Sequence, residues 1–320
     1  EDGSKMKVHR SGLSPADLEY IQTVRDAPPP AEDEEAGEGD AGQVSGENDE
    51  QAGPAKKQKI PDGLVLWLDA ADPRTVMVDA AGPTPQDLVT LPADAKGWVA
   101  QWADKSGKGF NAVQTNPRSR PAYVPNAFGG LPMVHYENGW QCLRTNCIPA
   151  TGKDPRTFIV AVANLKHIEK ALLCHILHYG SEENEKSYGI TYRGWKSTNW
   201  GNHYHHGALN SGIPMDSEGG YIVVAMFENG ADNFIVNGGA SYRQADPWPQ
   251  GAIDTAGGAG QKHGVVIGAG VNGAGAACGD IGEVMAFSRA VPPQERMGIE
   301  GYLAHKWGMA DRLPDAHPFK

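Results

Sequence analysis

Residues 192 to 206 hold the highest density of polar and aromatic side chains in the chain, YRGWKSTNWGNHYHH. A sugar presents apolar C–H faces ringed by hydroxyl groups, and flat aromatic rings beside amide, imidazole and guanidinium groups complement both features. The segment therefore predicts a carbohydrate-contact surface built from Tyr192, Trp195, Trp200, Asn202, His203 and His205. The alternative is that these aromatic rings pack inside the protein, as aromatics on strands usually do.

The same segment has a spacing that metal sites use. His203 and His205 share one face of an extended strand, and His175 or His178 is available as a further ligand. A separate loop, DKSGKGFN, offers oxygen ligands at Asp104 and Asn111 that suit a hard cation such as calcium. For Asp104 the alternative is an Asx turn, in which the carboxylate accepts hydrogen bonds from the backbone just ahead of it. The sequence indicates no required cofactor, and calcium is the one optional ion that it suggests.

Catalytic motifs are not evident in the predicted folded part. Glycoside hydrolysis uses two carboxylates at a set distance, whereas Glu182, Glu183 and Glu185 are expected in a loop after Gly180. The sequence contains neither a G-x-S-x-G elbow nor an H-E-x-x-H helix. The run from Val265 to Gly273 matches G-x-G-x-x-G, but further glycines and a strand follow it. Because a dinucleotide site needs a helix there, we expect a Gly-rich hairpin in its place. Because the catalytic motifs are missing, we expect no enzyme activity.

Many short apolar runs separated by turn residues must position these side chains. With 41 glycines and 23 prolines among 320 residues, the pattern favours an all-β sandwich or barrel. Asn229-Gly230 and Asn237-Gly238-Gly239 are strong turn signals. The predicted strands are 64–68, 98–102, 133–136, 157–163, 172–179, 188–192, 221–228, 233–236, 263–268 and 281–287.

One helix is predicted near the C-terminus, from Gln294 to Trp307. Its apolar residues Ile299, Leu303 and Trp307 recur at i, i+4 and i+8, which places them on one stripe. Two prolines precede it, and Gly308 is suited to end it. We expect this short helix to pack at the edge of the strands.

The formal net charge of −11 is concentrated in one segment. Residues 27–59 hold nine acidic residues and three lysines, which gives −6, with almost no apolar side chain. Such a segment cannot bury enough surface to offset its ordering entropy, so it predicts a flexible linker. No basic face is evident, which argues against nucleic-acid binding, and no apolar run is long enough to insert into a membrane. The four cysteines (Cys142, Cys147, Cys174 and Cys278) allow either disulfides or buried thiols.

An internal sequence repeat indicates the domain organisation. Residues 6–21 align without gaps on residues 284–299, with a strand-like run, a small-residue turn, prolines and an acid in both copies. Repetition at long spacing is typical of tandem arrays. We therefore predict three parts: the C-terminal end of a preceding similar domain at 1–26, the linker at 27–59 and a folded domain at 60–320.

Four stretches of the folded part carry family-like motifs. They are Leu64–Ala70, Trp102–Ala112 with its D-x-SG-x-G-x-N-A pattern, Val224–Gly230 with Phe234–Gly238, and Gly279–Val284 with Phe287–Ala290. These stretches resemble the laminin-G-like, concanavalin-A-like superfamily, in the bacterial form repeated in large secreted and surface proteins. The tail Gly301–Gly308 is similar to that of the bacterial subgroup. The resemblance covers residues 60–320 and implies a jelly-roll sandwich of two antiparallel sheets.

Members of that superfamily mostly bind carbohydrates or proteins, and some cleave glycans through an E-x-D-x-x-E strand that this sequence lacks. The resemblance thus implies a non-catalytic, carbohydrate-binding module of a large exported protein, at the cell surface or outside it, with a glycan or polysaccharide as partner. Two alternatives remain open, an adhesive domain that contacts other surface proteins and a glycan-cleaving enzyme. A shared fold does not by itself decide among these functions.

Overall fold

The computed structural model describes residues 61–79, 97–137, 140–166, 173–183, 186–192, 199–204, 207–215, 219–245, 253–255 and 263–320. The predicted preceding-domain end and linker, residues 1–59, lie outside the described residues, as do Trp195 and His205. None of the described helices is both long enough and apolar enough to cross a lipid bilayer.

Seventeen strands, three 3₁₀ turns and one α-helix make up the described part of the chain. The strands are β1 (Leu64–Asp69), β2 (Val76–Asp79), β3 (Trp98–Trp102), β4 (Ala112–Val113), β5 (Ala122–Phe128), β6 (Leu131–Tyr136), β7 (Leu143–Arg144), β8 (Arg156–Ala163), β9 (Cys174–Gly180), β10 (Ser187–Tyr192), β11 (Asn199–Tyr204), β12 (Gly207–Pro214), β13 (Gly220–Glu228), β14 (Ala231–Val236), β15 (Tyr242–Ala245), β16 (His263–Ile267) and β17 (Gly279–Phe287). The helical elements are η1 (Pro73–Thr75), η3 (Pro117–Ser119), α2 (Pro293–Lys306) and η4 (Ala310–Arg312).

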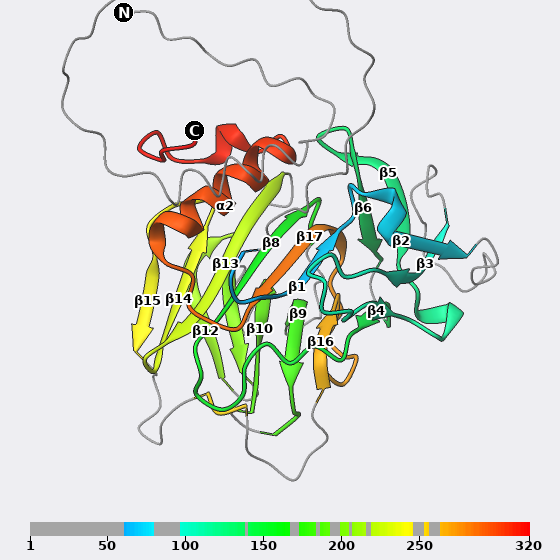
Figure 1. Ribbon diagram of the computed structural model, residues 1–320, viewed down its shortest axis with the longest axis horizontal. Helices are drawn as coiled ribbons and strands as arrows, with labels where there is room; N and C mark the ends of the chain where they lie inside the picture. Colours follow the sequence, from blue (N-terminus) through cyan, green and yellow to red (C-terminus); the bar gives the residue numbers. More distant parts are fainter. Residues whose placement is uncertain are drawn as a thin grey trace, which may run out of the picture.

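The named strands pair antiparallel throughout. They form one connected ladder, which branches at β17 and at β3. One stretch has the order β15–β14–β13–β8–β17, and β17 pairs with β1 along its C-terminal half. The N-terminal half of β17 pairs instead with β6, which leads through β5 to β3 and its neighbours β2 and β4. From β4 the ladder continues through β7, β16, β9, β10 and β11 to β12. The sheet therefore turns back on itself and is nearly closed (Figure 1).

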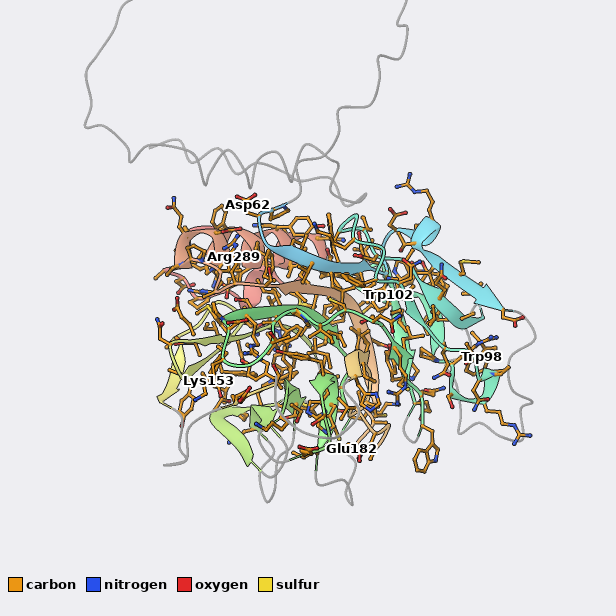
Figure 2. The ribbon with its side chains drawn as sticks, turned by 60° about the horizontal axis from the view of Figure 1, so that its bottom comes forward. Asp62, Trp98, Trp102, Lys153, Glu182 and Arg289 are labelled. Atoms are coloured by element: carbon orange, nitrogen blue, oxygen red, sulfur yellow. The ribbon has the colours of Figure 1, made fainter. Side chains whose placement is uncertain are left out.

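The core lies between strands that face each other across this turn. Phe158 on β8 packs against Tyr179 on β9 and Tyr188 on β10, with ring centroids 5.6 and 6.1 Å apart. Tyr188 in turn meets Phe227 on β13 edge-on. Strand β8 is buried along its whole length because both of its faces are covered, which explains its continuous apolar sequence. Figure 2 places Trp102 among the interior side chains and Trp98 nearer the edge of the fold.

Helix α2 closes the structure on the outside of the sheet, near β13 (Figure 1). Its predicted stripe of Ile299, Leu303 and Trp307 is buried. Gly282 on β17 has no side chain because a Cβ there would lie 2.7 Å from the Trp307 ring. At the start of the helix, Arg289 joins the carboxylate of Glu295 and the backbone oxygen of Asp62, and Figure 2 shows Asp62 and Arg289 together on this side.

The prediction of an all-β, antiparallel domain with a short C-terminal helix is confirmed. The expected Gly-rich hairpin is wrong, because β16 pairs with β7 and β9, whereas β17 pairs with β1, β6 and β8. The glycines form a connection between two different parts of the ladder, and a strand follows them. All four cysteines are buried and form no disulfide with one another.

Candidate functional site

The residues of the predicted carbohydrate surface do not lie together on one exposed face, because two of its aromatic rings are in the core. Tyr192 and Trp200 are fully buried, and their rings pack against each other with centroids 6.0 Å apart. The Tyr192 hydroxyl also bonds both the backbone N–H and the carbonyl of Cys278. These two rings therefore belong to the core, as the packing alternative proposed, and they offer no free face to a sugar.

Two other predicted residues, Asn202 and His203, lie on β11. In the strand register His203 is opposite Gly189 on β10, and Gly189 is opposite His178 on β9. A Cβ at Gly189 would lie 2.8 Å from the His178 ring, so glycine leaves the space that this imidazole needs. Among the described residues, no group of three or more His, Cys, Asp or Glu is arranged to hold a metal ion.

Below the Gly-rich connection, two imidazoles are stacked. The rings of His175 and His178 have centroids 4.6 Å apart, and Nδ1 of His178 accepts a hydrogen bond from the backbone N–H of Val271 at 3.2 Å. That donor places the proton of a neutral His178 on Nε2. The glycines at 270 and 275 allow the connection to approach these rings closely. The pair is therefore held inside the fold by the loop above it.

The candidate calcium loop is organised by its own hydrogen bonds. Oδ1 of Asp104 accepts from the backbone N–H groups of Trp67 and Ser106, and Oδ2 accepts from the Ser106 hydroxyl and the Phe110 N–H. Asn111 accepts from the N–H of Asp104. These contacts are those of the Asx-turn alternative, since N–H donors occupy both carboxylate oxygens. Calcium binding by Asp104 and Asn111 stays a prediction.

A different set of polar residues meets where β6 and β17 pair. His135 and Asp280 are directly opposite in the register, so their side chains share a face of the sheet. His135 Nδ1 lies 2.6 Å from Asp280 Oδ1, and its Nε2 lies 2.9 Å from Glu137 Oε2. Glu137 follows the end of β6 two residues after His135, which returns its carboxylate to the same side. An imidazole thus bridges two carboxylates.

Both ends of this Glu137–His135–Asp280 relay are fixed by neighbouring amides. Asn164 donates from Nδ2 to the second oxygen of Asp280 at 2.6 Å. Gln141 accepts from the backbone N–H of Glu137 at 2.6 Å and donates to the carbonyl of Arg120. The side chains of His135 and Asp280 are only 6% and 5% exposed, while that of Glu137 is 11% exposed. Glu137 is therefore the member of the relay nearest to solvent.

The electrostatics favour a charged imidazole. Burial alone would lower the pKa of His135, but the hydrogen bonds and negative charges of Asp280 and Glu137 outweigh it and raise that pKa above its usual value. A protonated His135 donates a hydrogen bond to each of the two carboxylates. The arrangement can therefore hold the Glu137 carboxylate in a fixed orientation at the more exposed end of the relay, as a nucleophile or general base requires.

No sequence pattern pointed to this relay. His135 and Asp280 are 145 residues apart, and neither belongs to a catalytic motif of fixed spacing. The one local signal was the alternation H-Y-E at the end of a predicted strand, which places His135 and Glu137 on one face. By contrast, Glu182 lies in the loop after β9, at the opposite end of the molecule from Asp62 (Figure 2).

Comparison with known proteins identifies relatives of the fold. No family model and no curated protein sequence matches this chain. A GH54 α-L-arabinofuranosidase, solved as a mutant soaked with 4-nitrophenyl α-L-arabinofuranoside, matches with a TM-score of 0.55 and 13% identity. An arabinofuranosidase complexed with arabinofuranosyl-α-1,2-xylobiose matches with a TM-score of 0.54 and 13% identity. In both cases the match covers 76% of this chain and 63% of the other chain.

A weaker likeness links the chain to domain 4 of AbnA, a GH43 extracellular arabinanase from Geobacillus stearothermophilus, in complex with arabinotriose. Its TM-score is 0.46 at 13% identity, and it covers 72% of this chain and 95% of that one.

These findings correct the functional expectation. The non-catalytic module inferred from the family resemblance, and with it the absence of enzyme activity, is contradicted, because solved structures that share the fold are those of a glycoside-cleaving enzyme. The missing E-x-D-x-x-E strand concerns only carboxylates that lie on one strand. In this fold, pairing of β6 with β17 brings Glu137 and Asp280 to one imidazole from distant segments.

Proposed function

We propose that this chain cleaves glycosidic bonds, with Glu137 as the carboxylate that acts on the sugar. The observation that carries the proposal is the relay in which His135 joins Glu137 to the buried Asp280. The fold shared with arabinofuranosidases supports it, since those proteins act on glycans with a comparable sheet architecture. Glycans are accordingly the proposed partners.

In this proposal each member of the relay has a separate role. Glu137 contacts the substrate as nucleophile or general base, and a second carboxyl group, outside the relay, protonates the leaving-group oxygen, as glycoside hydrolysis requires. The His135 imidazolium orients Glu137 by donating a hydrogen bond from Nε2. Asp280, enclosed by His135 and Asn164, is a positioning residue that holds the imidazole through Nδ1.

We propose three further features that were predicted from the sequence. They are the jelly-roll description of the nearly closed sheet, an extracellular or surface location, and glycan contacts from Asn202, His203, Trp195 and His205. Tyr192 and Trp200 are left out of the contact surface because both are buried.

The test is an assay for new reducing ends on arabinan, arabinoxylan and other polysaccharides, with wild-type protein and three variants. Glu137→Gln keeps the size and hydrogen bonding of the side chain but removes the charge, and we expect a loss of about 100-fold or more. Asp280→Asn should give a smaller loss with an altered pH profile, because it acts through His135. Glu182→Gln, which changes an exposed acid in the loop after β9 and outside the relay, is the matched control and should retain full activity.

Two results would overturn the proposal. One is the release of no reducing ends by the wild-type protein from any substrate of the panel. The other is full activity in Glu137→Gln, which would move the chemistry away from the relay.

A further inference from the structure

Trp140 differs from every other tryptophan that the structure describes. Trp67, Trp98, Trp102, Trp200 and Trp307 are all 8% exposed or less, whereas Trp140 is 73% exposed. Leaving so large an apolar ring in water forgoes the burial energy that the other five gain. Trp140 is also three residues from Glu137 in the chain.

The backbone that carries this ring is fixed on its C-terminal side. Gln141 is buried and bridges the N–H of Glu137 to the carbonyl of Arg120 through its side-chain amide. The N–H of Cys142 donates to the carbonyl of Ser119 at 3.1 Å, and Gln114 donates to the carbonyl of Cys142 at 2.8 Å. A ring displayed from a pinned backbone loses little conformational entropy when a ligand covers it.

The surroundings favour a sugar over a protein partner. A stable protein interface buries roughly 1,600 Å² around an apolar centre. Here the side chains that tie down the segment, Gln141 and Gln114, are polar and bond the backbone beside Trp140. One flat apolar surface with polar neighbours matches the apolar face and hydroxyl rim of a single sugar ring.

We propose that the Trp140 indole is a platform on which one sugar ring stacks beside Glu137. The inference rests on the proposed function and deepens it, because a ring held next to the cleaved bond requires a substrate of at least two sugar units. The substrate class is thus an oligosaccharide or polysaccharide, and a monosaccharide glycoside lacks the unit that occupies the platform.

The test compares Trp140→Ala and Trp140→Phe with Tyr242→Ala, another partly exposed aromatic, on β15. Affinity for arabinan and arabinoxylan is measured by calorimetry, independently of cleavage. We expect Trp140→Ala to bind about tenfold or more weakly, a change of about 1.4 kcal/mol, with Trp140→Phe in between and Tyr242→Ala unchanged. In kinetics, kcat/KM should fall more for the polysaccharide than for 4-nitrophenyl α-L-arabinofuranoside.

The outcomes separate this inference from the proposed function. If Trp140→Ala loses affinity but no reducing ends appear with wild type, the platform stands and the proposed chemistry fails. If wild type cleaves while Trp140→Ala keeps wild-type affinity and substrate preference, the chemistry stands and the platform is refuted. Binding to neither polysaccharide by wild type refutes the platform as well. Because the ring is exposed, a thermal midpoint close to wild type verifies that each variant is folded.

Discussion

Removing the ammonium group of Lys306 should lower the free energy of unfolding by more than a substitution at an exposed ion pair does. Lys306, at the end of α2, places Nζ 2.7 Å from Asp69 on β1 and 2.6 Å from Glu283 on β17. Glu283 is fully buried and also accepts hydrogen bonds from the indole N–H groups of Trp67 and Trp307. The cluster thus ties the helix to two strands that meet only in the tertiary structure.

The size of the stability loss in Lys306→Met follows from the ionisable groups around Lys306. Lys306 and Lys105, whose Nζ is 2.7 Å from Asp69, lower the pKa of Asp69 in spite of its burial, whereas burial raises the pKa of Glu283 in spite of Lys306. Lys306→Met keeps the aliphatic stem but leaves the buried carboxyl group of Glu283 without its cationic partner. Breaking a buried pair in this way costs about 3–5 kcal/mol. For a domain of this size, that lowers the Tm by roughly 10 °C.

Urea unfolding at constant pH measures the change as a lower midpoint at an unchanged slope. Lys320→Met is the matched control, since its partner Asp315 is exposed, and its midpoint should equal that of wild type. Adding Glu283→Gln to Lys306→Met should recover part of the loss, because glutamine removes the unpaired charge but still accepts from the indoles. A loss below about 1 kcal/mol for Lys306→Met would equal that of a surface pair and refute the reasoning.

Two further predictions concern the relay and the Asp104 loop. The pKa of His135 is raised in the folded state, so its contribution to stability is fully present below its unfolded pKa and declines as pH rises through the folded value. The unfolding free energies of wild type and His135→Gln should therefore converge as the pH rises above 6.5, the ordinary pKa of histidine, and a constant difference would contradict this. Asp104→Ala removes four accepted hydrogen bonds and should cost about 3 kcal/mol by urea unfolding, whereas Asp104→Asn, which retains one oxygen, should cost less. A fall in Tm on adding EDTA to wild type would instead favour the calcium hypothesis for this loop.

Local chemistry allowed much of the fold to be anticipated. The Asn229-Gly230 pair predicted a two-residue turn, and both residues have positive φ (52° and 70°) between the paired ends of β13 and β14. The stripe of Ile299, Leu303 and Trp307 predicted a helix, found at Pro293–Lys306. Short or irregular strands such as β4 and β7 were missed, because two residues carry too little periodicity to be recognised.

The candidate site was far less predictable than the fold. An aromatic-rich strand has the same composition whether its rings face a ligand or the core, and the burial of Tyr192 and Trp200 depends on partners such as Cys278 and Tyr221. The Gly-rich connection suggested a hairpin because nearest neighbours in sequence commonly pair. Which strand a strand pairs with is decided by long-range packing, and here β17 selected β6, β8 and β1.

By itself, the sequence determined where the chain extends, where it turns and where its final helix lies, because those choices depend on residues within a few positions of one another. Only the tertiary structure decided which carboxylates meet. The approach of Glu137, His135 and Asp280 arises from the pairing of two strands far apart in the chain, and the buried charges of Asp69, Glu283 and Lys306 from the docking of a helix on them. Such contacts leave no periodic trace in the sequence, since they are set by the closure of the whole sheet.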